Sequence, residues 1–400
     1  MMLTRSLGLY ISIPFCRSKC TYCNFASGVY PASEHGRYVG RLVDDLAQAP
    51  AWAAEVGVQL PRTVDTVYLG GGTPSLLEPA LIAQLFGAVR REFDLTPDAE
   101  VTMECAPGQI AQPTLEALVA AGVNRVSLGV QSFIDGEAAS SGRLHTRSVV
   151  LDDLRRLRSA GIENLNLDLI AGLAGQTFAS WEESLDVLLD AAVPHASIYM
   201  LEVDEDSRLG REMLAGGARY HAELVPSDDS IARMYERAVE RLEESGIVQY
   251  EISNFSRPGF ASRHNTRYWE RRPYLGLGLD ASSALYATGS EGYVLRATTT
   301  DELMEYLEGS NKPETAWLSP ARQFEEAWFL GLRLNSGVDL EGLEAEFGNE
   351  PMAAARVVTN RLASEGLLVL DDACARLTAR GRMMSNDVFQ EFLGMTERCR

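Results

Sequence analysis

The sequence predicts an α/β protein: an open, partial (β/α)6 barrel followed by a smaller, winged-helix-like α+β domain. Two observations support the barrel. Short apolar runs alternate with longer amphipathic patterns, and polar or glycine-rich segments follow the apolar runs. A third observation marks the second domain, since the alternation stops near residue 290. Strands that alternate with helices form parallel sheets with right-handed crossovers, and six repeats are too few for a closed eightfold barrel.

Six predicted strands and five predicted helices make up the repeating part. The strands are short and apolar, and the helices carry apolar residues at the spacing of one helical face. We expect strands at residues 9–13, 64–69, 101–105, 125–130, 165–170 and 196–201. We expect helices at residues 38–56, 79–93, 113–121, 149–160 and 178–191.

The carboxyl-terminal part has a different pattern. Helical segments near residues 301–307, 322–332 and 352–364 precede two short segments, 366–370 and 377–381, that are typical of a winged-helix-like fold. Because this stretch lacks the concentrated basic residues that phosphate contacts need, we expect a lid or docking role rather than DNA binding. The predicted domains are a barrel at 1–205, a barrel extension at 206–290 and the winged-helix-like domain at 291–400.

Composition and charge restrict the partners. The 400 residues are 46% hydrophobic and 23% charged, which is typical of a globular protein with a core. The formal net charge of −20 argues against binding to nucleic acid or anionic lipid, because both need a basic surface. No apolar stretch has the length of a membrane span, and the first residues lack the features of a signal peptide. We therefore expect a cytoplasmic protein with reduced cysteines, no nucleic-acid partner and at most peripheral membrane contact.

Three cysteines, Cys16, Cys20 and Cys23, follow the first predicted strand with C-x3-C-x2-C spacing. Iron–sulfur clusters are held by Cys thiolates, usually four, so this trio predicts a [4Fe-4S] cluster with one iron left open. A zinc site is the alternative, but it would need a fourth Cys or His, for which His35 is the only nearby candidate. The remaining cysteines are scattered, at Cys105, Cys374 and Cys399.

Polar residues stand at the ends of the predicted strands, where parallel α/β barrels gather their chemistry. A Gly-Gly-Gly-Thr-Pro segment, residues 70–74, follows the second strand, and Gln131 follows the fourth. Glu104 and Asp168 lie near the ends of the third and fifth strands. A carboxylate in an apolar strand is costly without a partner, so a cationic ligand with hydroxyl groups would suit both. The alternative is a salt bridge to an arginine, Arg125 or Arg143.

The C-x3-C-x2-C run, within Tyr10–Phe25, resembles the radical S-adenosylmethionine superfamily, and the stretch Leu9-Tyr10-Ile11-x-Ile13-Pro14-Phe15-Cys16 is similar to one branch of it. Residues 70–74, 124–133, 142–145 and 168–173 are similar to the branch that contains oxygen-independent coproporphyrinogen III dehydrogenases and the HemW heme chaperones. By this resemblance the three cysteines bind the cluster, and S-adenosylmethionine occupies its open iron. The resemblance implies cofactor contacts at Tyr10, Tyr22, Gly71, Gly72, Thr73, Glu104, Gln131, Arg143 and Asp168.

Two features favour the HemW family within this branch. The dehydrogenases carry a further cysteine where this chain has Phe25, and His264-Asn265-x-x-Tyr268-Trp269 resembles the H-N-x-x-Y-W signature of the HemW proteins. The resemblance implies a chaperone that binds heme and transfers it to hemoproteins. The expected acceptors are hemoproteins of a respiratory chain, and a homodimer is a further expectation. Three alternatives stay open: the dehydrogenase, a HemN-like radical methyltransferase, and a carrier whose cluster is only structural. Whether the protein is an enzyme is thus undecided at this point.

The signature segment has groups that suit heme. A neutral imidazole can bind heme iron, aromatic faces can pack on a porphyrin, and guanidinium groups can bind propionates. Heme is therefore a third expected ligand, with candidate contacts at His264, Arg267, Tyr268 and Trp269. The alternative is that His264 and Trp269 only fasten this segment over the barrel.

The sequence departs from the family pattern at three positions. Ser12 and Ser282 stand where the family usually has His, and Ala106 stands where it has Asn. These departures leave the predicted cluster residues in place but remove candidate ligands for porphyrin or iron.

Overall fold

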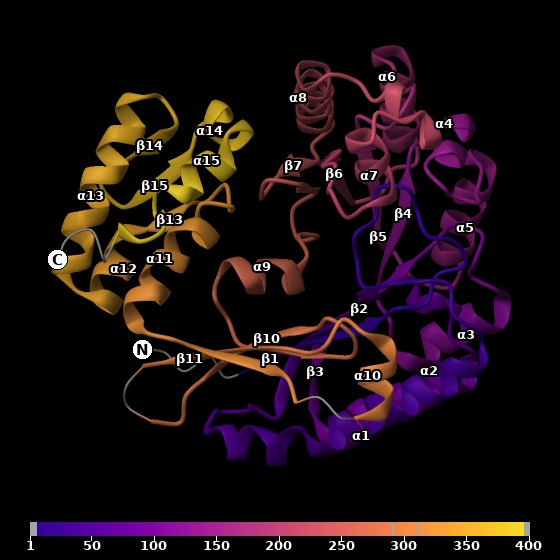
Figure 1. Ribbon diagram of the computed structural model, residues 1–400, viewed down its shortest axis with the longest axis horizontal. Helices are drawn as coiled ribbons and strands as arrows, with labels where there is room; N and C mark the ends of the chain where they lie inside the picture. The colour runs from indigo at the N-terminus through magenta and orange to yellow at the C-terminus, as the bar shows by residue number, and fades with distance from the viewer. Residues whose placement is uncertain (1–5, 290–291, 310–311, 396–400) are drawn as a thin grey trace.

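The computed structural model describes residues 6–289, 292–309 and 312–395. Its framework is a sheet of twelve strands in the order β12-β11-β10-β9-β1-β2-β3-β4-β5-β6-β8-β7. Figure 1 shows this sheet curving around one side of the molecule, with α1 and α2 on its outer face and the carboxyl-terminal domain opposite. The sheet does not close on itself, because its two ends are different strands, β12 and β7.

The central strands β1 to β6 are parallel neighbours, and each overlaps a predicted strand. Most of their side chains are buried, as expected for a parallel sheet covered on both faces. The predicted partial barrel is therefore confirmed. The six strands are β1 Leu7–Ile13, β2 Thr63–Gly71, β3 Asp94–Cys105, β4 Arg125–Gln131, β5 Asn164–Ala171 and β6 His195–Met200.

The helices between these strands also lie where the apolar spacing predicts them. Some begin with clear local signals: α6 starts at a capping box in which the Thr177 hydroxyl accepts the Ser180 backbone N–H. A further short helix, α4 Asp135–Ser140, was not predicted. The other five are α1 Ser33–Val56, α2 Pro79–Glu92, α3 Gln112–Ala121, α5 Arg147–Ser159 and α6 Phe178–Asp190.

Short strands extend the sheet on both sides, and the sequence pattern did not predict them. β9 pairs in parallel with β1, and β10, β11 and β12 then continue in antiparallel order. On the other side β8 and β7 follow β6. Strands of two to five residues give too little alternation to recognise. Their bounds are β7 Val248–Gln249, β8 Asn254–Ser256, β9 Tyr274–Leu277, β10 Ser282–Tyr286, β11 Val294–Thr298 and β12 Glu314–Leu318.

The carboxyl-terminal domain has its own hydrophobic core, which begins at Phe324 and contains the stacked rings of Trp328 and Phe392. Its three-stranded sheet has the order β13-β15-β14. Because β11 and β12 belong to the large sheet, we propose a domain boundary near residue 319 in place of 290. The elements are α11 Pro320–Gly331, β13 Val338–Asp339, α12 Leu340–Phe347, α13 Asn349–Ser364, β14 Leu368–Leu370, β15 Cys374–Leu377, α14 Ala379–Met383 and α15 Ser385–Gln390.

Four further helices complete the large unit: α7 Arg208–Leu214, α8 Asp228–Glu244, α9 Arg263–Trp269 and α10 Leu303–Glu308. Figure 1 shows α9 inside the curve of the sheet, between β2 and the carboxyl-terminal domain.

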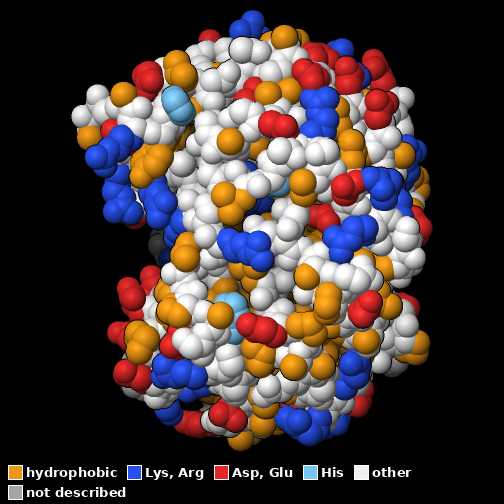
Figure 2. Space-filling model, turned by 90° about the vertical axis from the view of Figure 1, so that its right-hand side faces the viewer, with side chains coloured by type: hydrophobic (Ala, Val, Ile, Leu, Met, Phe, Trp, Pro, Cys, Tyr) orange, Lys and Arg blue, Asp and Glu red, His pale blue; other side chains and the backbone are white. Residues whose placement is uncertain are grey.

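No helix among the described residues is both long and apolar enough for a membrane span. On the face shown in Figure 2, acidic and basic side chains are interspersed over much of the surface.

Candidate functional site

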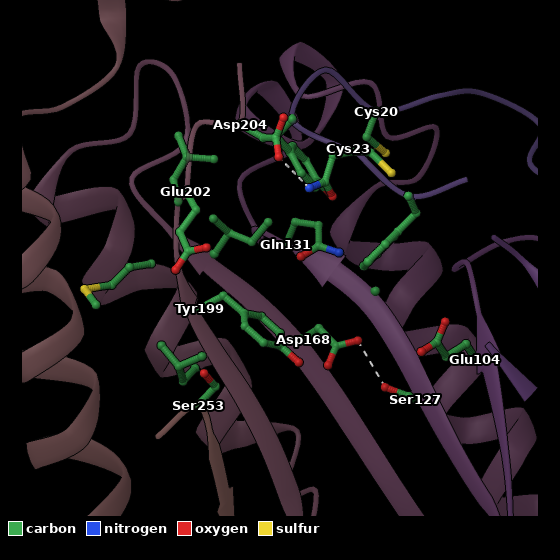
Figure 3. Close-up of a pocket in the computed structure, with 18 of the residues that line it drawn as sticks. Cys20, Cys23, Glu104, Ser127, Gln131, Asp168, Tyr199, Glu202, Asp204 and Ser253 are labelled. Atoms are coloured by element: carbon green, nitrogen blue, oxygen red, sulfur yellow. Dashed lines mark hydrogen bonds between the residues drawn. The ribbon is translucent and has the colours of Figure 1, made fainter. Parts of the chain in front are cut away.

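The carboxyl ends of the central strands open into a cavity of about 1030 Å³. Ligand pockets span about 300–1,000 Å³, so this one is at the upper end of the range. Its walls come from the cysteine loop, the ends of β2 to β6 and, from the carboxyl-terminal domain, α14 and α15. Figure 3 shows Cys20 and Cys23 adjacent to one another, with Gln131, Asp168 and Tyr199 on the strand ends nearby. The convergence predicted from the strand ends is therefore present.

All three cysteines of the predicted cluster site line this cavity. The Cys16 sulfur accepts a hydrogen bond from the Thr73 hydroxyl at 3.9 Å, and the Cys20 sulfur accepts one from Arg143 at 3.4 Å. Within the described ranges, no three His, Cys, Asp or Glu side chains are arranged around one metal ion. An iron–sulfur cluster has several irons, so its thiolates need not converge on a single point.

The other thiols lie apart from this trio. Cys105 is a free, buried thiol and Cys374 is a free thiol in the carboxyl-terminal domain, while Cys399 lies outside the described residues. His35, the candidate fourth zinc ligand, packs its ring on Phe15 at 4.2 Å and does not line the cavity. Cys105 and His145 also line the cavity, but the three cysteines of the loop are the ones that share one short segment of the chain.

The glycine segment fastens the cysteine loop. The backbone N–H groups of Gly72 and Thr73 donate to the carbonyls of Ile13 and Phe15, both at 2.8 Å. A Cβ on Gly72 would lie 2.8 Å from the same carbonyls, so only glycine permits this approach. Gly71 has a φ of +97°, which also favours glycine. The amides of Gly72 and Thr73 therefore hold the loop and are not free for a ligand, although the segment lines the cavity.

Two carboxyl groups face the cavity without a cationic partner. Glu104 accepts a hydrogen bond from the Tyr68 hydroxyl at 2.7 Å, and burial raises its pKa to about 7. Asp168 accepts from the Ser127 hydroxyl at 3.0 Å, and burial raises its pKa as well. Among the described residues neither carboxyl has a Lys or Arg nitrogen within 4.0 Å, so the alternative of a salt bridge is wrong. Ligand donors would satisfy both groups.

Gln131 is strained and incompletely hydrogen-bonded. Its φ of 69° lies in the left-handed region that non-glycine residues seldom adopt, next to an irregularity in the pairing of β4 and β5. The side-chain oxygen is buried, no group in the described part of the chain hydrogen-bonds with it, and the residue lines the cavity. Buried polar atoms are nearly always satisfied, so this acceptor fits a ligand that donates a hydrogen bond here.

The structure gathers eight of the nine predicted cofactor contacts around this cavity. Tyr10 is the exception: it lines a second cavity of about 340 Å³, and its ring stacks on Tyr68 at 6.2 Å. Tyr68 in turn donates to Glu104, so one ring separates Tyr10 from the Glu104 wall of the large cavity. The eight that line the large cavity are Tyr22, Gly71, Gly72, Thr73, Glu104, Gln131, Arg143 and Asp168.

Comparison with known proteins matches this architecture. Residues 10–188 match the radical SAM superfamily, and residues 318–384 match the HemN C-terminal domain. The heme chaperone HemW of Lactococcus lactis is 32% identical over 399 residues, which cover 98% of both chains. HemW of Bacillus subtilis is 32% identical over 393 residues, covering 96% of this chain and 98% of the relative. The chain belongs to the HemW family of radical SAM proteins.

A solved structure, coproporphyrinogen III oxidase (HemN) from Escherichia coli, has the same fold. It superimposes with a TM-score of 0.81 over 97% of this chain and 90% of its own, at 23% sequence identity. At that identity the similarity shows the fold alone. Membership of the radical SAM superfamily, in contrast, implies a [4Fe-4S] cluster and S-adenosylmethionine as cofactors.

The HemW signature lies on α9, where His264 is 1% exposed. Its Nδ1 is 2.9 Å from the Thr66 hydroxyl, and its Nε2 is 2.8 Å from the Tyr268 hydroxyl. Burial lowers the pKa of His264 to about 3, so the ring is neutral at physiological pH. Both ring nitrogens are engaged, and neither is available to heme iron in this conformation.

Arg267 is also part of the core, with no exposed surface. Its guanidinium forms a salt bridge with Asp65 and donates to the Pro273 carbonyl at 3.0 Å. Burial lowers the pKa of Arg267 to about 10. The Glu100 carboxylate accepts the backbone N–H of His264 at 2.9 Å and so caps α9. Direct heme contact by His264 and Arg267 therefore disagrees with the geometry, which ties both to the sheet.

Tyr268 and Trp269 have a different position within the HemW signature. Both line the second cavity, and heme contact by these two stays a prediction. The ring of Trp269 packs against the guanidinium of Arg333, whose central carbon lies 4.3 Å from the ring centroid. Arg333 and Arg382 of the carboxyl-terminal domain line the large cavity, and the sequence reasoning missed both. No local pattern marks them, because only the docking of the two domains brings them there.

The three departures from the family pattern fall at the two cavities or beside them. Ala106 lines the large cavity and Ser282 lines the second one. Ser12 is 5% exposed and lies on β1, directly before the cysteine loop. The positions thus adjoin the candidate site, with small side chains in place of larger ones.

Proposed function

We propose that this protein is a heme chaperone, which binds heme and transfers it to hemoproteins. The observation that carries the proposal is the similarity to proteins named heme chaperone HemW over 98% of the chain, which includes both domains. The size of the cavity supports it, because about 1030 Å³ leaves room for a further ligand beside a cofactor. Acceptors in a respiratory chain, a homodimer, a cytoplasmic location and peripheral membrane contact stay predictions.

We further propose that Cys16, Cys20 and Cys23 hold the cluster and that S-adenosylmethionine binds beside them. When bound, this pair supplies the chemistry of reductive cleavage of S-adenosylmethionine. Gln131 would accept a hydrogen bond from the cofactor. This role is supported by its buried side-chain oxygen, which has no hydrogen-bond partner among the described residues. Arg143 donates to the Cys20 sulfur at 3.4 Å and so stabilises negative charge on that ligand.

The carboxyl groups would hold the hydroxyl and amino groups of the cofactor. Asp168 is kept in place by Ser127 at 3.0 Å and by the Asn166 amide at 2.7 Å. Its side chain therefore needs little reorganisation to accept a ligand hydroxyl. Glu104, with a pKa raised by burial to about 7, would gain from a cationic neighbour that stabilises its ionised form.

A second candidate function is that of the coproporphyrinogen dehydrogenase, favoured by the fold match to HemN with a TM-score of 0.81. Phe25 weighs against it. This residue lines the cavity and is 62% exposed, at the position where the dehydrogenases carry a further cysteine. A radical methyltransferase is an outcome that the same experiment distinguishes.

The experiment is anaerobic cluster reconstitution followed by separate titrations with hemin and with coproporphyrinogen III. Absorbance reports heme uptake, and mass spectrometry of products reports turnover in the presence of S-adenosylmethionine and a reductant. The proposal expects stoichiometric heme uptake, transfer to an apo-hemoprotein and no change in the porphyrinogen. Protoporphyrinogen would establish the dehydrogenase, a methylated product would establish the methyltransferase, and either would contradict the chaperone.

A further inference from the structure

Five cationic side chains line the large cavity, although the chain is strongly acidic. Within the described part of the chain, none of them has a carboxylate oxygen within 4.0 Å. Most other buried or half-buried arginines do have such a partner, for example Arg267 with Asp65 and Arg296 with Glu326. The five are Arg17, Lys19, Arg143, Arg333 and Arg382.

Three of these cations belong to the cluster side of the cavity. The Lys19 ammonium donates to the carbonyls of Phe25 and Ser27 at 2.8 and 2.9 Å, which closes the cysteine loop. Arg143 is engaged with the Cys20 sulfur, and Arg17 lies exposed on the loop itself. The other two, Arg333 and Arg382, come from the carboxyl-terminal domain and form a separate cationic wall.

Arg333 is desolvated without full compensation. Burial lowers its pKa, and its Nε is buried without a hydrogen-bond partner. The guanidinium packs between aromatic rings, with centroid distances of 4.3 Å to Trp269 and 5.9 Å to Phe389. The carboxylates of Glu251 and Glu202 partly oppose this lowering of the pKa of Arg333 through their charge. A charge removed from water in this way is costly until a counter-ion arrives.

The groups around Arg333 are held in place. The Glu251 carboxylate is already occupied, since it accepts the Ser253 backbone N–H at 3.1 Å and also binds the Asn254 side chain. The next residues of the chain are fixed, because the Asn335 amide donates to the Gln249 carbonyl at 2.8 Å. Arg333 is therefore preorganised at the cavity, as a binding residue should be.

Arg382 completes the wall from α14. Among the described residues its guanidinium has one hydrogen-bond partner, the Leu377 carbonyl, at a long 3.4 Å. Met383 and Met384 follow it on the cavity lining and supply apolar surface. The same wall contains one carboxylate, Asp387, which is exposed, so the balance of charge remains positive.

We propose that Arg333 and Arg382 bind the two carboxylates of heme, its propionates, on the wall that the carboxyl-terminal domain contributes to the cavity. This inference rests on the proposed heme-binding function. Guanidinium groups bind carboxylates in bidentate fashion, and an apolar ligand with two acidic groups matches a wall of two arginines beside methionine side chains. Trp269 acts here as a positioning residue, because its ring supports Arg333. Through this contact with Arg333, Trp269 of the HemW signature would contribute to heme binding without touching the propionates.

The test is a titration of the reconstituted full chain with hemin and with hemin dimethyl ester, whose propionates carry no charge. For the wild type we expect the ester to bind roughly 10- to 100-fold more weakly, since a hydrogen bond to a charged group contributes about 1.5–3 kcal/mol. Arg333→Met and Arg382→Met should each weaken hemin binding while leaving binding of the ester unchanged. Arg380→Met is the matched control, an exposed arginine on the same short helix as Arg382 that does not line the cavity.

The outcomes separate this inference from the function on which it rests. Absence of hemin binding by the wild type overturns the proposed function and, with it, the propionate site. Hemin binding that is equal in the wild type, Arg333→Met and Arg382→Met overturns only the propionate site. Trp269→Leu should reduce the preference for hemin over its ester. Arg333→Lys should retain part of the preference that Arg333→Met loses. Circular dichroism of each variant identifies any that does not fold.

Discussion

The cysteine loop and the signature helix α9 are both short polar segments that suggest ligand binding, yet the structure uses them in opposite ways. In the loop, the Cys16 sulfur accepts from the Thr73 hydroxyl at 3.9 Å, the Cys20 sulfur accepts from Arg143 at 3.4 Å, and both cysteines line a cavity. On α9, His264 has both ring nitrogens satisfied by the protein. The difference teaches that the type of side chain does not decide its role; the partners that the fold supplies decide it.

The largest expected effect tests the loop. Replacing Cys16, Cys20 and Cys23 together with serine should abolish iron and sulfide incorporation, because the cluster is held by thiolates. Iron and sulfide analysis after anaerobic reconstitution measures it. Cys374→Ser is the control, since this thiol lies in the carboxyl-terminal domain. Unchanged iron content in the triple variant would refute the cluster site.

The next effect tests α9. Arg267→Met leaves the buried Asp65 carboxylate without one of its partners, so the free energy of unfolding should fall by about 3–5 kcal/mol. Urea denaturation measures the loss. Arg263→Met is the control, because that arginine is 41% exposed in its contacts with Asp65 and Asp98, and its loss should cost at most about 1 kcal/mol. Equal stability of the two variants would contradict a structural role for Arg267.

A smaller effect should show that Gln131 contributes to ligand affinity and not to the stability of the fold. Gln131→Ala removes an acceptor that has no partner within residues 6–289, 292–309 and 312–395, so stability should stay within about 0.5 kcal/mol of the wild type. Affinity for S-adenosylmethionine should drop roughly three- to tenfold, the value of one net hydrogen bond. Anaerobic calorimetry measures the affinity, with Gln112→Ala on the exposed end of α3 as control. Unaltered affinity would remove Gln131 from the cofactor site.

The last expected effect is a gradual pH dependence of stability. Burial lowers the pKa of His264 from 6.5 to about 3, so below pH 6.5 the unfolded chain takes up a proton that the folded chain does not. The free energy of unfolding should therefore fall as pH drops from about 6.5 to about 3, by at most about 1.4 kcal/mol per pH unit from this group. His264→Gln should flatten the curve. His145 has the same sign but is present in both proteins, so parallel curves would count against the buried, neutral His264.

The sequence contains enough information for the barrel and for one side of the site. The strands β1 to β6 alternate with amphipathic helices, and in a parallel sheet the residues after each strand meet at one edge, which brought Glu104, Gln131 and Asp168 to the cysteines. Local patterns could not predict β9 to β12, whose stability comes from pairing with distant strands.

Long-range contacts also explain what the sequence could not show about the heme residues. The roles of His264 and Arg267 depend on Thr66 and Asp65, which are about two hundred residues away along the chain. Arg333 reaches the cavity only because the second domain docks beside α9. Neither contact leaves a periodic signal. The chemistry of the segment suggested heme contacts at His264 and Arg267, whereas the fold engages both side chains within the protein.

The most direct test of this division between the loop and α9 is a hemin titration of the folded His264→Gln variant, followed by difference absorbance. A glutamine amide can still hydrogen-bond with Thr66 or Tyr268, so the helix should stay in place. We predict a hemin dissociation constant within about threefold of the wild type, which corresponds to a change of about 0.7 kcal/mol or less. A folded variant that loses hemin binding by tenfold or more would show that His264 contacts heme and would contradict the account.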